Sequence, residues 1–126
     1  MNFPENVKYT KEHEWIRVEG DVAYVGITDY AQNQLGDIVF VDVPTEGDTV
    51  EAEGIFGSIE VVKTVSDLFM PVTGKVLEVN EAIDDDPSLV NSDPYGEGWI
   101  IKITPLDSCQ MEHLLDVTEY QSIINE

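Results

Sequence analysis

Lysine is scarce in this chain, and one lysine lies where another enzyme could modify it. The 126 residues include 26 acids against six Lys and Arg, and Lys63 is the only one of the six between Arg17 and Lys75. Runs rich in β-formers at residues 54–61 and 65–70 predict a hairpin with Lys63 in its turn. A protruding turn suits covalent modification of the amine. Position alone, however, favours an ordinary solvated lysine.

The segments that must hold this turn read mostly as short strands separated by glycine and proline. One short helix is expected between them, with Thr28 as its N-cap and Gly36 as its stop. Residues 80–94 are rich in turn formers and acids, and we expect them to be irregular. This pattern predicts a mainly β fold, a flattened barrel or sandwich. The predicted strands are residues 15–18, 22–27, 38–43, 49–51, 54–61, 65–70, 72–79 and 98–103.

The end of the chain changes to a helical pattern. Asp107 or Ser108 can cap a short helix that runs to Leu114, and Asp116 with Glu119 resembles a capping box that opens a final helix. The length suits one domain. We therefore expect a single domain over residues 1–126, with its core at about 20–104 and a C-terminal helical extension at about 106–126.

The charge narrows the possible partners. A formal charge of -20 and a pI near 4.1 disfavour nucleic acid and anionic membranes. No apolar run approaches the ~20 residues of a membrane helix, and no targeting peptide is visible. We expect a cytoplasmic protein, although a mature organellar protein would look the same. The acidity fits solubility and steering toward basic docking surfaces equally well.

Several groups that could suggest catalysis or metal binding have simpler explanations. His13 and His113 lie in separate segments without ligand spacing, and residues 84–86 lack the glycine and glutamate of a calcium loop. Cys109 is the only cysteine, and we expect it to be a small buried residue. No phosphate loop or catalytic triad is present. We expect neither a metal site nor an enzyme.

The sequence around Lys63 carries a more specific signal. Residues 57–68, GSIEVVKTVSDL, and residues 71–76, PVTGKV, resemble the lipoyl-lysine hairpin of glycine cleavage H proteins. Two positions depart from the family pattern: Val61 replaces a small polar residue or alanine, and Thr64 replaces a frequent alanine. Both keep strand character. The resemblance continues in family order at Tyr9, 13–16, 26–32, 35–41, 80–81, Pro87, 89–91, 93–95, 98–99 and 119–120.

This resemblance implies a lipoyl, or hammerhead, type of fold and a carrier function without catalysis. Lys63 would hold lipoate in amide linkage. The arm would take the aminomethyl group of glycine from a pyridoxal-phosphate decarboxylase to a tetrahydrofolate-dependent aminomethyltransferase, and electrons to dihydrolipoamide dehydrogenase. A lipoate-attaching enzyme is the fourth partner. Glu14 matches a position that holds the loaded arm, and Asp67 is its expected companion, although each alone reads as a solvated surface acid.

Other functions remain open from the sequence alone. Within the carrier class, the protein could serve or relay lipoate to another lipoate-dependent pathway. A biotin carrier fits less well because its lysine is typically flanked by methionines, and Lys63 is not. In a different class, the chain could be an unmodified acidic β-sandwich that binds proteins, with Lys63 as an ordinary turn residue.

Overall fold

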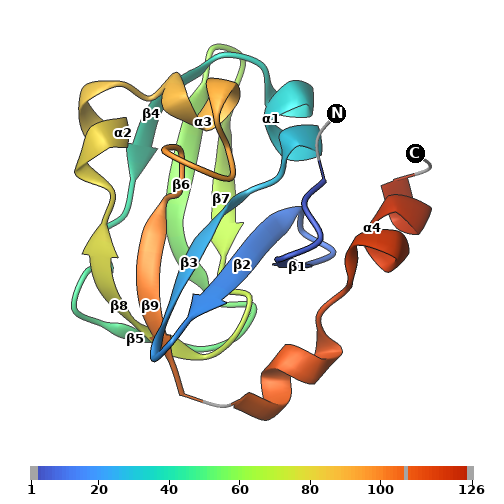
Figure 1. The fold of residues 1–126 in the computed structure, drawn as a ribbon. Helices are drawn as coiled ribbons and strands as arrows, with labels where there is room; N and C mark the ends of the chain where they lie inside the picture. Colours follow the sequence, from blue (N-terminus) through green and yellow to red (C-terminus); the bar gives the residue numbers. More distant parts are fainter. Residues whose placement is uncertain (1–2, 107, 125–126) are drawn as a thin grey trace.

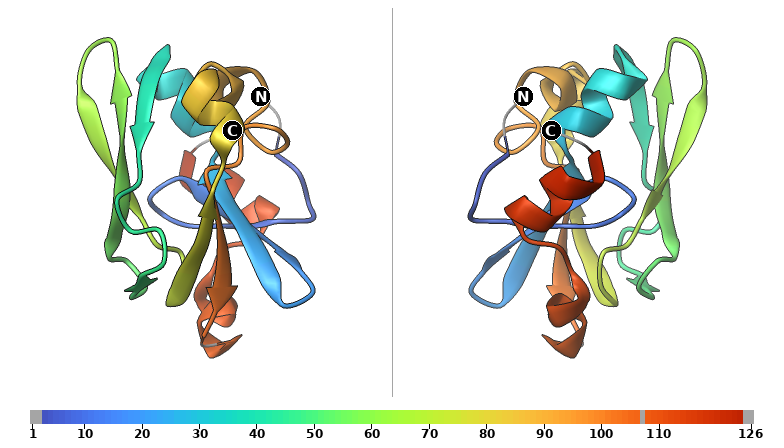
Figure 2. Two further views of the ribbon diagram at one scale, coloured as in Figure 1. Left: turned by 90° about the vertical axis from the view of Figure 1, so that its left-hand side faces the viewer. Right: turned by 90° about the vertical axis from the view of Figure 1, so that its right-hand side faces the viewer.

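The computed structural model describes residues 3–106 and 108–124, without the side chains of Ser108 and Cys109. Two antiparallel sheets face each other (Figures 1 and 2), one with the order β1-β2-β3-β9-β8-β5 and one with the order β4-β6-β7. The predicted mainly β, flattened sandwich is thereby confirmed. The strands are β1 Lys8–Tyr9, β2 Glu14–Glu19, β3 Val22–Ile27, β4 Ile38–Asp42, β5 Thr49–Val50, β6 Ile55–Val61, β7 Val65–Phe69, β8 Gly74–Val79 and β9 Ile101–Pro105.

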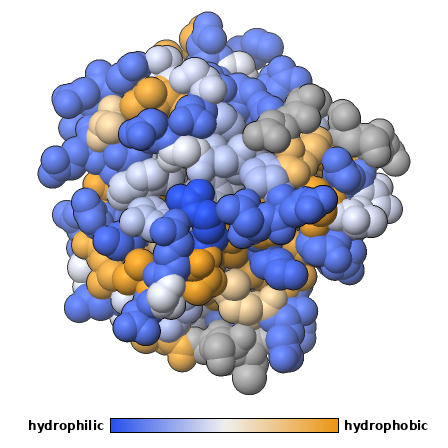
Figure 3. Space-filling view, viewed as in Figure 1, coloured by the Kyte–Doolittle hydropathy of each residue, from blue (hydrophilic) through white to orange (hydrophobic). Residues whose placement is uncertain are grey.

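Helices cover the ends and one side of this sandwich. None of the helices in the described residues is long and apolar enough to cross a membrane. Hydrophilic side chains cover much of the face in Figure 3, with smaller apolar areas between them, as the strong acidity leads one to expect. The helices are α1 Asp29–Leu35, α2 Glu81–Asp85, α3 Leu89–Ser92, the 3₁₀ helix η1 Ser108–His113 and α4 Val117–Ile124.

The main core lies between the two sheets. Alternation along β6 buries Ile59 and Val61 and leaves Glu60 between them exposed, because successive strand residues point to opposite faces. The side chains of this core are drawn from both sheets, so they fix the β6–β7 hairpin on the larger sheet. Fully or nearly fully buried members are Val25, Phe56, Ile59, Leu68, Val76, Ile101 and Ile103.

The short helix after the first hairpin, α1, begins and ends where predicted. The backbone N–H of Ala31 donates to Thr28 Oγ1 over 3.1 Å, which caps the first turn. Gly36 takes a positive φ of 84° and stops the helix. The helix follows β3 directly, and residues of α1 and of β7 line one cavity.

The prediction for residues 80–94 was wrong. This segment forms α2 and α3, which bury Ile83 and Val90 against the core. Asn80, read as a turn former, is the N-cap of α2, and its amide also donates to the carbonyls of Glu97 and Trp99. The last strand, β9, therefore begins at Ile101 rather than residue 98.

The C-terminal segment packs a second, aromatic cluster against the larger sheet. The capping box is confirmed: Glu119 N–H donates to Asp116 Oδ1 over 2.8 Å, and Asp116 N–H donates to Glu119 Oε1 over 3.1 Å. Tyr120 of α4 is fully buried and stacks on Tyr9 with ring centroids 4.6 Å apart. The predicted cap at Asp107 and the predicted burial of Cys109 lie outside the described residues.

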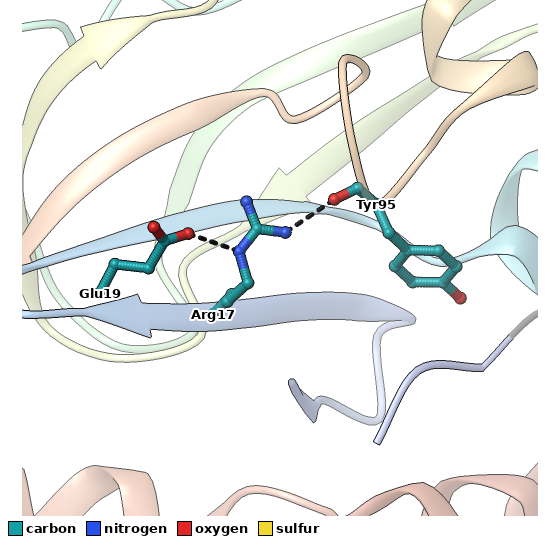
Figure 4. A network of polar contacts seen from close by, with 3 residues as sticks. All are labelled: Arg17, Glu19 and Tyr95. Carbon is teal, nitrogen blue, oxygen red and sulfur yellow. Dashed lines mark hydrogen bonds and ion pairs between the residues drawn. The ribbon is translucent and has the colours of Figure 1, made fainter. Parts of the chain in front are cut away.

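Arg17 ties the loop around Tyr95 to strand β2 (Figure 4). Its guanidinium donates to Tyr95 O and to Glu19 Oε2, each over 2.7 Å. It also lies 5.2 Å from the ring centroids of Trp15 and Tyr24. Because the guanidinium is partly desolvated between rings, these contacts should stabilise this side of the sandwich more than a free surface ion pair would.

The fit of β6 against the end of β4 can be tested at Gly57. A Cβ on this residue would lie 2.5 Å from Asp42 O and 3.1 Å from Val43 Cγ2. We expect Gly57→Ala to lower the free energy of unfolding by about 1–3 kcal/mol, because the backbone must move to relieve the overlap. Urea unfolding measures this loss. The neighbouring Ser58→Ala is the control, and equal stabilities of the two variants would contradict the prediction.

Candidate functional site

Lys63 lies in the turn of the β6–β7 hairpin, as predicted. The strand pairing ends at Glu60 and Val65, and Val61 N–H donates to Thr64 O over 2.9 Å to close the turn. Figure 2 shows this hairpin loop at the outer edge of the molecule in both views. The turn is therefore a fixed projection from a rigid sheet rather than a loose loop.

The side chain of Lys63 is exposed and free. Its ammonium makes no hydrogen bond or ion pair to any residue of the described part of the chain, where the ion pairs are Arg17–Glu19 and Lys102–Glu78. A primary amine in this position can be reached by a second protein and can form an amide with an activated carboxylic acid. The position thus meets the steric requirement for a modified lysine.

A cavity of about 420 Å³ lies beside strand β7, between the hairpin and α1. This volume is within the range of small-molecule pockets. Its walls are mainly apolar, and a few polar groups converge on it, as in a site that holds a chain with one polar end. Apolar lining residues include Ile27, Ala31, Leu35, Ile59 and Leu68, and polar ones include Glu12, His13, Glu14, Ser66 and Asp67.

Glu14 is the most unusual of these polar groups. Only 2% of its surface is exposed, and its carboxyl accepts hydrogen bonds from Phe69 N–H over 3.0 Å and from Thr10 Oγ1 over 3.2 Å. Burial raises the pKa of this carboxyl to about 8, while the two hydrogen bonds oppose the shift. The first residue of β2 therefore places a carboxyl of fixed orientation at the cavity wall, and its raised pKa favours the protonated form at neutral pH when the cavity is empty.

Asp67 lies on strand β7 and lines the same cavity, but its side chain is exposed. The structure thus brings together Glu14 and Asp67, which are far apart in sequence. Lys63 does not line the cavity. Strand β7 leads from the hairpin turn to the cavity, and Phe69 at its far end is about 13 Å along the strand from Val65. An arm attached at the turn would have to fold back along β7 to reach Glu14.

The sequence reasoning missed one residue of this site, His13. It was considered only as a metal ligand, whereas its side chain lines the cavity next to Glu14. Its partner is Tyr120, 107 residues further along the chain, so no local pattern could have indicated the contact. No group of three or more potential metal ligands occurs among the described residues.

A second cavity, of about 500 Å³, adjoins the first. Glu12, Glu14 and Phe69 line both cavities, and Gln110, His113, Leu114 and Leu115 of the C-terminal segment form much of the second wall. The buried carboxyl of Glu14 therefore lies at the boundary between two hollows. The hydrogen bonds from Thr10 and Phe69 hold it there.

Comparison with known proteins gives one consistent family. A family model described as Glycine cleavage H-protein matches residues 7–126. The chain is 66% identical to the glycine cleavage system H protein of Bacteroides fragilis, over 99% of both chains. It is 54% identical to that of Halalkalibacterium halodurans, over 99% of this chain and 98% of the relative. A crystal structure of a glycine cleavage system H protein from Mycobacterium marinum superposes with a TM-score of 0.88 at 40% identity, covering 98% of this chain and all of that one.

The raised pKa of Glu14 predicts a pH-dependent stability. Between the ordinary value of 4.5 and about 8, the folded protein keeps a proton that the unfolded chain has released, so this group's contribution falls as pH rises. Relative to Glu14→Gln, which mimics the protonated carboxyl, the wild type should lose about 1.4 kcal/mol of unfolding free energy for each pH unit in this window. Urea unfolding from about pH 5 to about pH 8 measures the difference.

Asp67→Asn is the matched control, because its carboxyl lines the same cavity but is exposed. This variant should keep the pH dependence of the wild type. If Glu14→Gln and the wild type differ by a constant amount over the whole window, the Glu14 carboxyl is not protonated in the folded protein and the prediction is wrong.

Proposed function

The chain belongs to the glycine cleavage H-protein family, and we propose that Lys63 is the residue that carries its lipoyl group. Members of this family are carriers rather than enzymes, and they hold lipoate covalently on a lysine. The protein is accordingly a lipoyl carrier of glycine cleavage. The observation that supports Lys63 is its free, exposed amine at the tip of a rigid hairpin.

The other lysines offer less suitable positions. Lys8, Lys75 and Lys102 lie within strands β1, β8 and β9 of the larger sheet, where a side chain stands on the sheet rather than at a tip. Lys11 lies in the short β1–β2 connection and lines the second cavity against the C-terminal segment. An attaching enzyme must enclose the lysine, and the projecting hairpin gives it access on both sides of Lys63.

The bound lipoyl group would supply a dithiolane that accepts an aminomethyl group and two electrons. The protein supplies position: one flexible arm on a rigid scaffold meets each active site at high effective concentration. Interaction with other components of glycine cleavage follows from family membership. We propose as specific partners the pyridoxal-phosphate decarboxylase, the tetrahydrofolate-dependent aminomethyltransferase, dihydrolipoamide dehydrogenase and a lipoate-attaching enzyme, with the whole chain acting as one carrier domain. The bacterial relatives support a cytoplasmic location.

Glu14 and Asp67 are proposed to hold the loaded end of the arm in the cavity beside β7. The aminomethyl nitrogen is cationic, and a carboxylate in an apolar cavity is its natural partner. An adjacent cation favours the ionised carboxyl, so its arrival would lower the pKa of Glu14 from about 8 and form an ion pair away from water. Asp67, exposed on β7, adds negative charge at the cavity wall.

Attachment at Lys63 is tested by intact-mass measurement. The full chain produced in lipoate-replete cells should gain the mass of one lipoyl amide, and Lys63→Arg should show none, because arginine keeps the charge but cannot form this amide. Lys11→Arg, which alters a second loop lysine, is the matched control and should be modified like the wild type. An unmodified wild type would instead favour a protein-binding module, and modified Lys63→Arg would place the group elsewhere.

The role of Glu14 is tested by the lifetime of the loaded arm. In Glu14→Ala the loaded form should break down roughly tenfold faster or more, because a charge-assisted contact worth about 1.5–3 kcal/mol is lost. Asp67→Asn should have a smaller effect because its side chain is exposed. Mass measurement should show normal lipoylation of both variants. An unchanged lifetime in Glu14→Ala would exclude Glu14 from holding the arm.

A further inference from the structure

The side chain of His13 is hydrogen-bonded to the C-terminal helix α4. Its Nδ1 lies 2.8 Å from the hydroxyl oxygen of Tyr120 on α4, and the same hydroxyl lies 2.8 Å from Thr28 Oγ1. Tyr120 and Thr28 are fully buried. The stack of Tyr120 on Tyr9 fixes the ring, so its hydroxyl has a single orientation relative to the cavity wall.

The hydrogens of this chain of contacts can be assigned by counting donors and acceptors. Thr28 Oγ1 already accepts from Ala31 N–H, so its own proton must find an acceptor inside the protein. Tyr120 oxygen is that acceptor, which leaves the Tyr120 proton to be donated to His13 Nδ1. If Tyr120 instead donated to Thr28 Oγ1, the buried Thr28 hydroxyl would have no acceptor among the described residues. A buried donor without an acceptor lowers the stability of the folded protein.

This assignment fixes the tautomer of His13. Burial lowers the pKa of the imidazole, so the ring is neutral and carries one proton. Burial also raises the pKa of Tyr120 to about 12, so its hydroxyl keeps the proton that it donates. With Nδ1 as an acceptor, the ring proton is on Nε2. No described residue accepts a hydrogen bond from Nε2, and His13 is one of the residues that line the cavity of Glu14.

The backbone keeps the ring in this place. His13 has a positive φ of 68°, unusual for a residue other than glycine, and its carbonyl accepts from Thr28 N–H over 3.0 Å. The ring also lies 5.0 Å from that of Tyr30, between the centroids. The cavity thus has two fixed polar groups at its wall: the carboxyl of Glu14 and the imidazole of His13.

We propose that His13 is a positioning residue for the loaded arm, donating a hydrogen bond from Nε2 to an acceptor atom of the arm, with Tyr120 of α4 setting the direction of that donor. The inference rests on the proposed function and extends it. Glu14 can hold only the cationic end of the arm. A donor beside it is suited to an amide oxygen or a sulfur lone pair, so the two residues together would fix both position and orientation.

Two variants separate the parts of this proposal. His13→Asn keeps a polar atom near the position of Nδ1 for Tyr120 and tolerates the positive φ, but it ends before the position of Nε2. We expect lipoylation and melting temperature close to those of the wild type and a loaded-arm lifetime about tenfold shorter, as for the loss of one hydrogen bond. His113→Asn changes an exposed histidine that lines only the adjoining second cavity, and it should leave the lifetime unchanged.

The second variant, Tyr120→Phe, keeps the aromatic ring but removes the hydroxyl. Nitrogen-15 NMR of the histidine rings, on protein without the arm, should show His13 protonated at Nε2 in the wild type and a mixture of tautomers in Tyr120→Phe. This measurement tests the direction of the donor, and the loaded-arm lifetime of His13→Asn tests its role toward the arm. Protonation of His13 at Nδ1 in the wild type would overturn the proposal without involving the arm.

The lifetime measurements distinguish failure of this inference from failure of the proposed function. If Glu14→Ala shortens the lifetime of the loaded arm and His13→Asn does not, His13 has no positioning role while the cavity still holds the arm. If neither variant changes the lifetime, the arm does not occupy this cavity, and both proposals for it fail. Shortening in both variants, with normal melting temperatures, supports the proposal.

Discussion

The hydrogen bond from Phe69 N–H to the carboxyl of Glu14 joins the two sheets of the sandwich. Phe69 ends β7, which pairs only with β6 and so has an unpaired edge, and Glu14 begins β2 in the larger sheet. An edge N–H inside a protein needs an acceptor, and Glu14 provides it without closing the gap between the strands. The Glu14 side chain spans the gap between β2 and β7, whereas direct hydrogen bonds between the two backbones would have brought these strands together. The cavity beside β7 exists because this contact is made by a side chain.

The carrier function sets two opposed requirements, and different parts of one hairpin meet them. A lysine that carries lipoate, as proposed for Lys63, must be exposed at the tip, and the short turn closed by Val61 and Thr64 keeps it clear of the body. Lower on the same strand, Leu68 is buried in the core and Asp67 lines the cavity. Because strand β7 leads from one to the other, the same rigid element would set both the reach of an arm attached at Lys63 and its proposed place of return.

The sequence predicted what depends on local patterns. The β-branched runs around Lys63, the cap at Thr28 and the capping box at Asp116 all act within a few residues, and each is confirmed. The helices between residues 80 and 94 were missed because Asn80, a good turn former, is equally a good N-cap, and only burial of nearby apolar side chains decides between the two. No local pattern could indicate the burial of Glu14, because its carboxyl contacts Phe69, 55 positions further along the chain. Without the family resemblance, an acid in so acidic a chain would have been read as solvated.

The proposed role of Glu14 places a buried acid against a cationic amine, and the energetics of such a pair would make the cavity selective. In the empty cavity the raised pKa favours the neutral form of Glu14, so this buried carboxyl, unlike the exposed Asp67 at the wall, does not itself draw ordinary cations out of water. An amine differs from a metal ion because it exchanges protons with water: its free base can accept the proton of Glu14 inside the cavity and so become the cationic end proposed for the loaded arm. The ion pair then forms in place, with no net uptake of charge and with the full strength of a low-dielectric contact. A solvated carboxylate would attract any cation from solution, whereas Glu14 becomes charged only for a ligand basic enough to take its proton.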